Sequence, residues 1–557
     1  MQKIRIAGPP GTGKTTYLMK RYYDALDKYL AADIMIMSHT KTAANEIRKK
    51  INDPENIAEY HKETGKDLFN LIKETKKIRE TNVSTIHKYC KNEITKSKGG
   101  DVFEISDYER LKAKYRIFNI HTLTRTFSFI ESLFKNHPFF KFIDLARDNG
   151  YGKDLTSYYR TLSYEERKED YKYSIQELIH MNDKYKDYKT NPLLNEGRKN
   201  VMDFHDMIEK FCDLPKDPVI KVLMIDEAQD SSVIQRDAEK KMSRNCDLFY
   251  KAGDPDQSIF EFAGADPDSF HKEFARPEVE LEIGYRCPRK INEWCREVIR
   301  DIWEDPAYNY TRKWTPRREL DSEGKPTGPI VEGEIYNLMN LNQDPSLYIL
   351  IDKLINTKET FIFTYRSGEP RDILDFLRKL NLPIKLISDK VQSFSYPTTD
   401  ITNQREFISF SQDESKTLAV AKKILKNIDS EYRGSNYSKE EMEKLEKGRY
   451  DINYFIKKNY LLPIVKKTKD LQDLVSTNDL KTKNYIRNIV KENRDLDDFR
   501  IFVANIHTIK GMEFDHVVLD LKISREEPKY TKKRLKFVAG SRARETLWLI
   551  KSKGLSL

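Results

Sequence analysis

The chain has 557 residues, of which 34% are charged and 38% are hydrophobic. This composition is typical of a globular protein and excludes a disordered chain, and no apolar run approaches the ~18 residues that a membrane-spanning helix needs. The length exceeds what one hydrophobic core supports and predicts about three or four domains. The net charge of +10 is explained equally well by a polyanionic partner and by a lysine-rich solvated surface.

The N-terminal segment KIRIAGPPGTGKTT (3–16) contains the pattern G-x-x-x-x-G-K-[ST] between a β-prone run and a helical pattern that begins near Lys14. In such a loop the backbone N–H groups surround the β-phosphate, the lysine reaches the β- and γ-phosphates, and the hydroxyl of Thr15 binds Mg²⁺. We therefore expect a nucleoside triphosphate and Mg²⁺ to bind at Gly8, Pro9, Pro10, Gly11, Thr12, Gly13, Lys14, Thr15 and Thr16.

The segment KVLMIDEAQD (221–230) places an acidic pair after four apolar residues. The apolar run predicts a buried parallel strand, and ligands of open α/β sheets bind beyond the carboxyl ends of such strands. Asp226 is suited to hold Mg²⁺ through water, and Glu227 is suited to orient and deprotonate the attacking water. This pattern predicts a hydrolytic site.

Two long stretches separate the motifs and are interpreted as helical insertions. Lys14 and Asp226 lie too far apart in sequence for a phosphate-loop fold with short connections, and residues 91–200 are rich in lysine and tyrosine at helical spacing. Residues 386–498 are similarly charged and helical in pattern. The tyrosines and lysines of 158–188 favour a solvated helix face over a nucleic-acid track, and the basic segment 311–319, with its tryptophan, is another possible DNA contact.

Further segments follow in a fixed order: DIMIMSHTKTAANEIRKK (33–50), NVSTIHKYC (82–90), DFHDMI (203–208), GDPDQSIF (253–260), IGYRCPRKI (283–291), FIFTYRSGEP (361–370), VANIHTIKGMEFDHVVL (503–519) and FVAGSRARETLWLI (537–550). Together with the first two motifs they resemble the UvrD/Rep branch of the superfamily 1 helicases. GDPDQSIF is similar to the 3′→5′ branch of that superfamily.

The resemblance implies an α/β fold with two RecA-like P-loop lobes, each built on a parallel sheet and interrupted by a mainly helical inserted domain. The first lobe is expected at 1–90 and 201–283, with its insertion at 91–200. The second is expected at 284–385 and 499–557, with its insertion at 386–498.

For the ATP site, the resemblance implies that Gln257 senses the γ-phosphate and that Arg286 and Arg542 act as arginine fingers from the second lobe. Arginine suits this role because it stays charged and offers forked donors to phosphate oxygens. Tyr285 would stack on the adenine, and the segment KGMEF would contribute Gly511 and Glu513, the latter at the ribose.

For the nucleic-acid site, the resemblance implies that Phe260 and Phe262 stack on bases, an interaction worth ~1–3 kcal/mol per base that tolerates any sequence. A buried, structural role for these phenylalanines and for the histidines stays open. The remaining contacts implied by the resemblance are His39, Thr40, His87, His507, Thr508 and Lys510.

Two departures from the family pattern concern the nucleotide and the DNA contacts. The phosphate loop starts at Gly8, which leaves no room for the upstream glutamine motif that reads adenine, so we expect other purine triphosphates to be tolerated. Ala263 replaces the arginine that is common after the second aromatic residue, which removes one expected DNA contact.

The function predicted is that of an ATP-dependent DNA helicase or translocase that uses Mg²⁺ and moves 3′→5′ on single-stranded DNA and at junctions with duplex. RNA as the track stays open because stacking does not read the sugar. The alternatives are a translocase that strips bound proteins but unwinds weakly, and a DNA-binding regulator that uses ATP as a switch. Five scattered cysteines without a CxxC pair are typical of reduced thiols and predict a cytoplasmic location.

Overall fold

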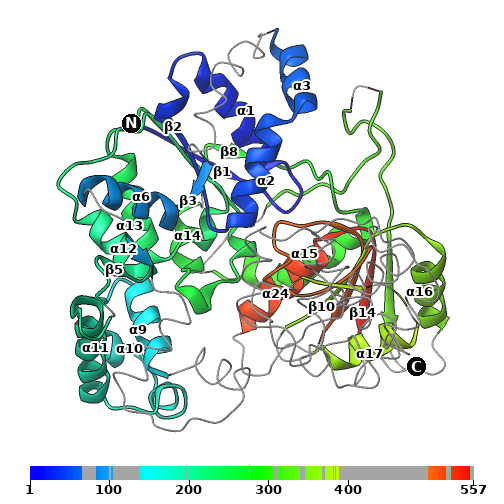
Figure 1. Cartoon of the computed structure of the whole chain (residues 1–557). Helices are drawn as coiled ribbons and strands as arrows, with labels where there is room; N and C mark the ends of the chain where they lie inside the picture. The colour runs from blue at the N-terminus through cyan, green and yellow to red at the C-terminus, as the bar shows by residue number, and fades with distance from the viewer. Residues whose placement is uncertain are drawn as a thin grey trace, which may run out of the picture. The chain divides into compact units, whose positions relative to one another are not determined.

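The computed structural model (Figure 1) describes residues 1–65, 83–98, 102–104, 138–195, 197–274, 276–306, 312–322, 324–338, 345–366, 370–380, 382, 384–387, 500–521 and 529–551. The chain divides into two compact units, Met1–Gly333 with Glu526–Arg544, and Glu334–Arg525 with Glu545–Leu557. Apart from 386–387, the insertion expected at 386–498 lies outside the described residues. Among the described helices, none is long and apolar enough to cross a membrane.

The first unit is built on a six-stranded sheet with the order β3-β2-β6-β7-β1-β8, in which all neighbouring strands are parallel. The central strand β6 is buried along its whole length, as expected for a parallel sheet that is covered on both faces. The strands are β1 (Gln2–Ala7), β2 (Ile34–Ser38), β3 (Val83–Thr85), β6 (Val222–Ile225), β7 (Leu248–Gly253) and β8 (Val279–Glu280).

Helices cover both faces of this sheet, because alternate residues of each strand point to opposite sides. Ile34 and Ile36 of β2 pack in one core with α1 and α2, and Met35 and Met37 pack in another core with α6, α12 and α13. The helices of the unit outside the insertion are α1 (Lys14–Leu26), α2 (Lys41–Asn52), α3 (Pro54–Thr64), α6 (Ile86–Lys98), α12 (Phe204–Cys212), α13 (Val233–Ser243), α14 (Pro267–Glu273), α15 (Arg289–Trp303) and α24 (Lys529–Gly540).

The region expected as the first insertion contains helices with a separate, aromatic core. These are α9 (Pro138–Asp148), α10 (Leu155–Thr161) and α11 (Ile175–Thr190), and a short parallel pair of strands, β4 (Phe103–Glu104) and β5 (Val201–Met202), lies at its ends. Tyr158, Tyr171, Tyr185 and Tyr188 are buried in this core. Both interpretations from sequence, solvated face and nucleic-acid track, are therefore wrong for these four tyrosines, since helical spacing does not reveal which face is covered. The solvated face is found instead at residues such as Tyr164, Lys184 and Lys186, which are exposed.

The second unit contains a six-stranded sheet with the order β11-β12-β10-β13-β14-β9. The pairs β11–β12, β12–β10, β10–β13 and β14–β9 are parallel, and α16 (Pro345–Asn356) and α17 (Arg371–Lys379) pack on the sheet. The prediction of an α/β fold with two parallel sheets is confirmed. The strands are β9 (Glu334–Leu338), β10 (Phe361–Tyr365), β11 (Ile384–Ile387), β12 (Ile501–Asn505), β13 (Phe514–Asp520) and β14 (Ala543–Ile550).

The division between the units differs from the expected lobe boundary at residue 284. Residues after that point remain attached to the first unit because they bond to it: the Tyr285 N–H donates to the carbonyl of Gly11 at 2.9 Å, and the indole N–H of Trp303 donates to Asp256 at 3.0 Å. The helix α24 also belongs to this unit and packs on α15.

Candidate active site

The phosphate-binding loop connects β1 to α1, and its glycines adopt backbone conformations that other residues avoid. Gly11 has φ +72° and Gly13 has φ +83°, and a Cβ at Gly11 would lie 2.5 Å from the Cβ of Arg286. The Lys14 ammonium donates to the carbonyls of Gly8 at 2.7 Å and Pro9 at 3.3 Å. Burial lowers the pKa of Lys14, so the loop encloses a desolvated cation, which is the group that an anionic phosphate would stabilise.

The acidic pair follows β6, at the same edge of the sheet as this loop. The Thr15 hydroxyl donates to Asp226 Oδ2 at 2.8 Å. Burial, and then the charge of Glu227, raise the pKa of Asp226 to about 6. A hydroxyl, a buried carboxylate and a second carboxylate beside it are oxygen donors of the kind that Mg²⁺ prefers, and a cation would relieve their repulsion. The residues present therefore fit Mg²⁺, and Thr15 and Asp226 are the side chains that would hold it.

Glu227 is held in a strained backbone conformation, with φ 54° and ψ 40° in the left-handed region. A non-glycine residue there costs on the order of 1–3 kcal/mol. Its carboxylate accepts a hydrogen bond from Gln229 Nε2 at 2.5 Å, and Gln229 Oε1 accepts from the Asp254 N–H at 3.0 Å. Gln229 thus joins the proposed general base to the segment that follows β7. Sequence analysis missed this role, since one glutamine after an acidic pair carries no signal by itself.

Gln257 lies in the short helix η4 (Pro255–Gln257) and is 2% exposed. Its amide nitrogen donates to Asp254 Oδ2 at 2.7 Å, and its amide oxygen accepts from Arg542 Nη2 at 2.6 Å. Asp254 also pairs with the buried Arg312. The structure therefore brings Gln257 and Arg542 into direct contact within the first unit, and the backbone carbonyl of Val538 accepts a hydrogen bond from Arg542 Nε at 2.9 Å.

Arg286 and Tyr285 lie beside the phosphate loop. Tyr285 is 47% exposed, as a residue that stacks on a base must be. Arg286 Nη1 donates to the Ser541 carbonyl at 3.4 Å, next to Arg542. In the first unit the structure thus places Tyr285 and Arg286 against the loop and Arg542 against Gln257.

The segment 311–319, a possible DNA contact from sequence, is not available for that role at Arg312 and Trp314. They are 4% and 3% exposed. Arg312 is turned inward by the buried charge of Asp254, and the Trp314 ring packs edge-on against Phe537, with centroids 5.8 Å apart. The hypothesis is therefore wrong for these two side chains, and Arg312 instead neutralises the carboxylate that holds Gln257.

The two predicted base-stacking residues follow Gln257 directly. Phe262 is 56% exposed and Phe260 is half-buried. Their ring centroids lie 5.8 Å apart with an interplanar angle of 52°. A core role is excluded for Phe262, and the two rings form an aromatic step close in sequence to Gln257, which is predicted for the ATP site.

His39 and Thr40 lie after β2, and their polar atoms have partners in the protein. Ser231 Oγ lies 3.2 Å from His39 Nε2 and donates to Glu239 Oε1 at 2.5 Å. The Thr40 hydroxyl accepts from the Ala43 N–H at 3.1 Å and caps α2. The His39 ring is partly exposed, so it can still meet a base.

His87, in the first turn of α6, packs edge-on against the exposed ring of Phe204, with centroids 5.1 Å apart. Burial, and then the charge of His205, lower the pKa of His87 to about 4. The ring is therefore neutral at pH 7. A neutral imidazole offers an aromatic face without a charge.

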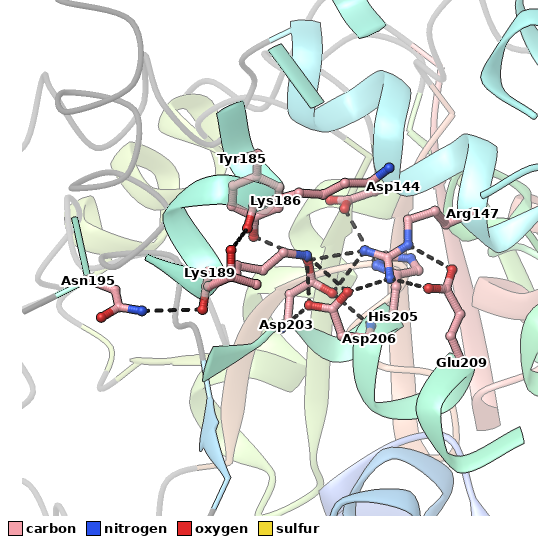
Figure 2. A network of polar contacts seen from close by, with 11 residues as sticks. Asp144, Arg147, Tyr185, Lys186, Lys189, Asn195, Asp203, His205, Asp206 and Glu209 are labelled. Carbon is pink, nitrogen blue, oxygen red and sulfur yellow. Dashed lines mark hydrogen bonds and ion pairs between the residues drawn. The ribbon is translucent and has the colours of Figure 1, made fainter. Parts of the chain in front are cut away.

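The motif DFHDMI (203–208) covers the N-cap and the first turns of α12. Its aspartates take part in a buried network of charges that joins this helix to α9 and α11 (Figure 2). Arg147 contacts Asp203 at 3.1 Å, Asp206 at 2.7 Å and Glu209 at 2.7 Å. Lys189 contacts Asp206 at 2.7 Å. The acidic residues of the motif are thus structural: they hold the insertion helices on α12.

His205, from the same motif, lies between two carboxylates of α9. Its ring nitrogens are 3.5 Å from Asp144 and 3.2 Å from Asp148. Burial alone would lower the pKa of His205, but the hydrogen bond and charge of Asp148, with Asp144, raise it above the ordinary value.

In the second unit, the remaining predicted residues lie in the loop between β12 and β13. His507 Nδ1 is 2.9 Å from Asn505 Oδ1, which also accepts from the His507 N–H at 3.0 Å. Thr508 and Lys510 are half-buried, Glu513 is exposed, and Gly511 has φ +88°. This loop follows the carboxyl end of a parallel strand, where ligands of such sheets bind.

Comparison with known proteins supports the interpretation of these motifs. A family model described as the UvrD/REP helicase N-terminal domain matches residues 1–276, and one described as the UvrD-like helicase C-terminal domain matches residues 500–550. The chain is also 24% identical, over 324 residues, to the probable DNA helicase II homolog of Mycoplasma pneumoniae (strain ATCC 29342 / M129 / Subtype 1). That alignment covers 53% of this chain and 39% of the relative, so the chain spans less than half of the relative's length. With both family models in their expected order on two parallel sheets, the chain belongs to the UvrD/Rep-like helicase family.

Proposed function

We propose that the protein is an ATP-dependent DNA helicase or translocase that moves 3′→5′ along single-stranded DNA and acts at junctions with duplex. The observation that carries this proposal is the segment 253–265. Its first half contacts Arg542 through Gln257, and its second half presents the exposed ring of Phe262. Nucleotide chemistry and base stacking thus meet on one short stretch of backbone.

In this proposal the phosphates bind to the loop backbone and to Lys14, whose buried ammonium gains a counter-charge. Thr15 and Asp226 would hold Mg²⁺, which supplies charge neutralisation at the phosphate oxygens. Glu227, whose carboxylate is oriented by Gln229, accepts the proton of the attacking water.

Two groups of residues complete the nucleotide site as proposals. Gln257, Arg286 and Arg542 stabilise the charge that develops on the γ-phosphate, because arginine and amide donors suit phosphate oxygens. The ring of Tyr285 stacks on the base. Stacking does not discriminate among purines, so we expect GTP to support activity as well as ATP. Gly511 and Glu513 remain proposed nucleotide contacts.

The nucleic acid is proposed to stack on Phe260 and Phe262 and to meet the neutral ring of His87 and the oriented ring of His39. Base stacking on aromatic faces accounts for binding without sequence preference. Thr40, whose hydroxyl caps α2, and three residues of the second unit are the remaining proposed contacts: His507, Thr508 and Lys510. We further propose that the two six-stranded sheets are the cores of the two RecA-like lobes of the family, although residues 284–333 and 526–544 are grouped with the first sheet.

The experiment that tests this function is strand separation on two partial duplexes, one with a 3′ single-stranded tail and one with a 5′ tail, in the presence of ATP and Mg²⁺. Unwinding from the 3′ tail alone is the expected result. The variants Lys14→Ala and Glu227→Gln should lose turnover, and full DNA-stimulated hydrolysis in either would contradict the assigned chemistry.

Other outcomes of the same experiment separate the alternatives. Unwinding from the 5′ tail alone would reverse the proposed direction. ATP hydrolysis stimulated by single strands without unwinding would favour a translocase that displaces proteins. Nucleotide-dependent DNA binding without sustained hydrolysis would favour a regulator that uses ATP as a switch.

A further inference from the structure

The helix α24 contacts both halves of the segment that joins Gln257 to the aromatic step. Arg542, two residues beyond the end of the helix, donates to Gln257 at 2.6 Å. In its first half, Arg534 Nη1 donates to Glu261 Oε1 at 2.8 Å and the Thr531 hydroxyl donates to Glu261 Oε2 at 2.7 Å. Glu261 lies between the two phenylalanines in sequence.

The contact with Glu261 restrains the aromatic step more tightly than a surface ion pair would. Both carboxylate oxygens are held, by different side chains of one helix, so the carboxylate cannot rotate between them. The Arg534 side chain is only 3% exposed, and Thr531 is 5% exposed. Charge-assisted hydrogen bonds are stronger and more directional than neutral ones, and here the donors are largely shielded from water.

The helix itself is packed on the first unit along its length. Lys529 contacts Asp301 of α15 at 3.1 Å and Lys533 contacts the same carboxylate at 2.5 Å. At its C-terminal end, Gly540 lies so close to the ring of Trp294 that a Cβ would collide with it. A helix held at several points moves as one body, because close-packed interiors transmit small displacements.

We propose that α24 transmits the binding of nucleotide, sensed at Gln257, to the aromatic step. Glu261, Arg534 and Thr531 are the positioning residues through which the helix acts on Phe260 and Phe262. The inference rests on the proposed function. It adds the residues that make nucleotide binding and DNA binding dependent on each other.

Such coupling is measured as a ratio of affinities. The dissociation constant for fluorescent oligothymidylate is determined with and without a non-hydrolysable ATP analogue and Mg²⁺. Allosteric coupling of this kind typically changes affinity by about 5- to 150-fold. We expect a ratio in this range for the wild type and a ratio within about threefold of one for Glu261→Gln, which keeps the shape but removes the charge.

A second pair of variants tests the same contact with less disturbance. Thr531→Val is isosteric and removes the donor to Glu261, and Thr531→Ser retains it. The ratio should fall in the first variant and be restored in the second. A merely structural role would weaken binding equally in both nucleotide states and leave the ratio unchanged.

The matched control is Asp301→Asn, which removes two ion pairs at a carboxylate that is 46% exposed. Pairs of this kind contribute only about 0–1 kcal/mol, and the packing of Gly540 on Trp294 and the contacts with Glu261 remain, so this variant should keep the wild-type ratio. A wild-type ratio in Glu261→Gln and Thr531→Val would overturn the inference alone. A wild-type protein that shows no hydrolysis stimulated by single-stranded DNA would overturn the proposed function, and the inference with it.

Discussion

Replacing Arg147 with methionine removes the central cation of the network in Figure 2 while keeping most of the side-chain volume. Arg147 contacts three carboxylates, and the side chains of Arg147, Asp203 and Asp206 are 7%, 1% and 13% exposed. Lys189 would remain beside the two aspartates, 3.3 Å from Asp203 and 2.7 Å from Asp206. The substitution therefore leaves excess buried negative charge.

Breaking a buried ion pair by removing one partner costs about 3–5 kcal/mol. The contact with Glu209, whose side chain is 34% exposed, adds little because such rim pairs contribute about 0–1 kcal/mol. We expect a loss of about 3 kcal/mol, which increases the opening equilibrium of the affected helices by roughly a hundredfold. Because the network joins α9 and α11 to α12, the loss should be confined to these helices.

The assay is hydrogen exchange read by mass spectrometry, since a chain with two compact units does not have a single unfolding free energy. Peptides from α9 and α11 should exchange about a hundredfold faster, and peptides from α16 and α17 in the second unit should not change. Asp206→Asn is the matched control. It removes one carboxylate, leaves the remaining charges more nearly balanced and preserves a capping side chain, so its effect should be smaller. Exchange in Arg147→Met within threefold of the wild type would refute the assumption that this network holds the insertion.

Three further predictions concern the candidate site. Burial and the neighbouring carboxylate raise the pKa of Asp226 to about 6 from an ordinary 3.8. The stability that protonated Asp226 contributes is therefore fully present below pH ~4 and is lost as pH rises through about 6. This loss is on the order of 2–3 kcal/mol. Thermal unfolding should therefore show greater stabilisation by Mg²⁺ and ATP at pH 7.5 than at pH 5, and the same increment at both pH values, or a pH-dependent increment that survives in Asp226→Asn, would contradict this. The single hydroxyl hydrogen of Ser231 goes to Glu239, so His39 Nε2 must donate to Ser231 Oγ, and ¹⁵N chemical shifts should show the Nε2–H tautomer. Ser231→Ala should weaken binding of single-stranded DNA in the wild-type background but not in a His39→Phe background. An Nδ1–H tautomer would contradict this prediction. Phe262→Ala should weaken the same binding by the ~1–3 kcal/mol of one stacked base with little change in unfolding temperature, whereas Phe262→Trp should retain it; unaltered affinity in the alanine variant would remove Phe262 from the interface.

The parts of the site that could be predicted from sequence are those specified by local pattern. The spacing of the glycines, Lys14 and Thr15 predicts the loop because glycine tolerates the positive φ found at Gly11 and Gly13, and the lysine and hydroxyl follow at a fixed distance. The acidic pair was predictable because it follows a run of buried residues. Each of the two sheets likewise follows from short apolar runs separated by helical patterns.

The parts that could not be predicted depend on partners distant in sequence. Asp254 and Arg312 are 58 residues apart, and Gln257 and Arg542 are 285 residues apart. The sequence does not distinguish a buried arginine from a solvated one. The role of Arg312 therefore became clear only from its contact with Asp254 in the structure. The same limitation applies to the tyrosines of the insertion, whose period indicates a helix face without showing what covers it.

The segment 253–265, which carries Gln257 and the two phenylalanines, lies against different elements at three successive points. One of these elements belongs to the insertion. Gln257 contacts Arg542, and Glu261 contacts Arg534 on α24. Gly264, with φ +79°, lies so close to Asp148 of α9 that a Cβ would collide with that side chain. Asp148 in turn contacts His205 at 3.2 Å. Since Gly264 lies against α9, the charges that hold α9 on α12 also restrict where the end of the segment 253–265 can lie. The insertion is thus part of the scaffold that supports the proposed DNA contact.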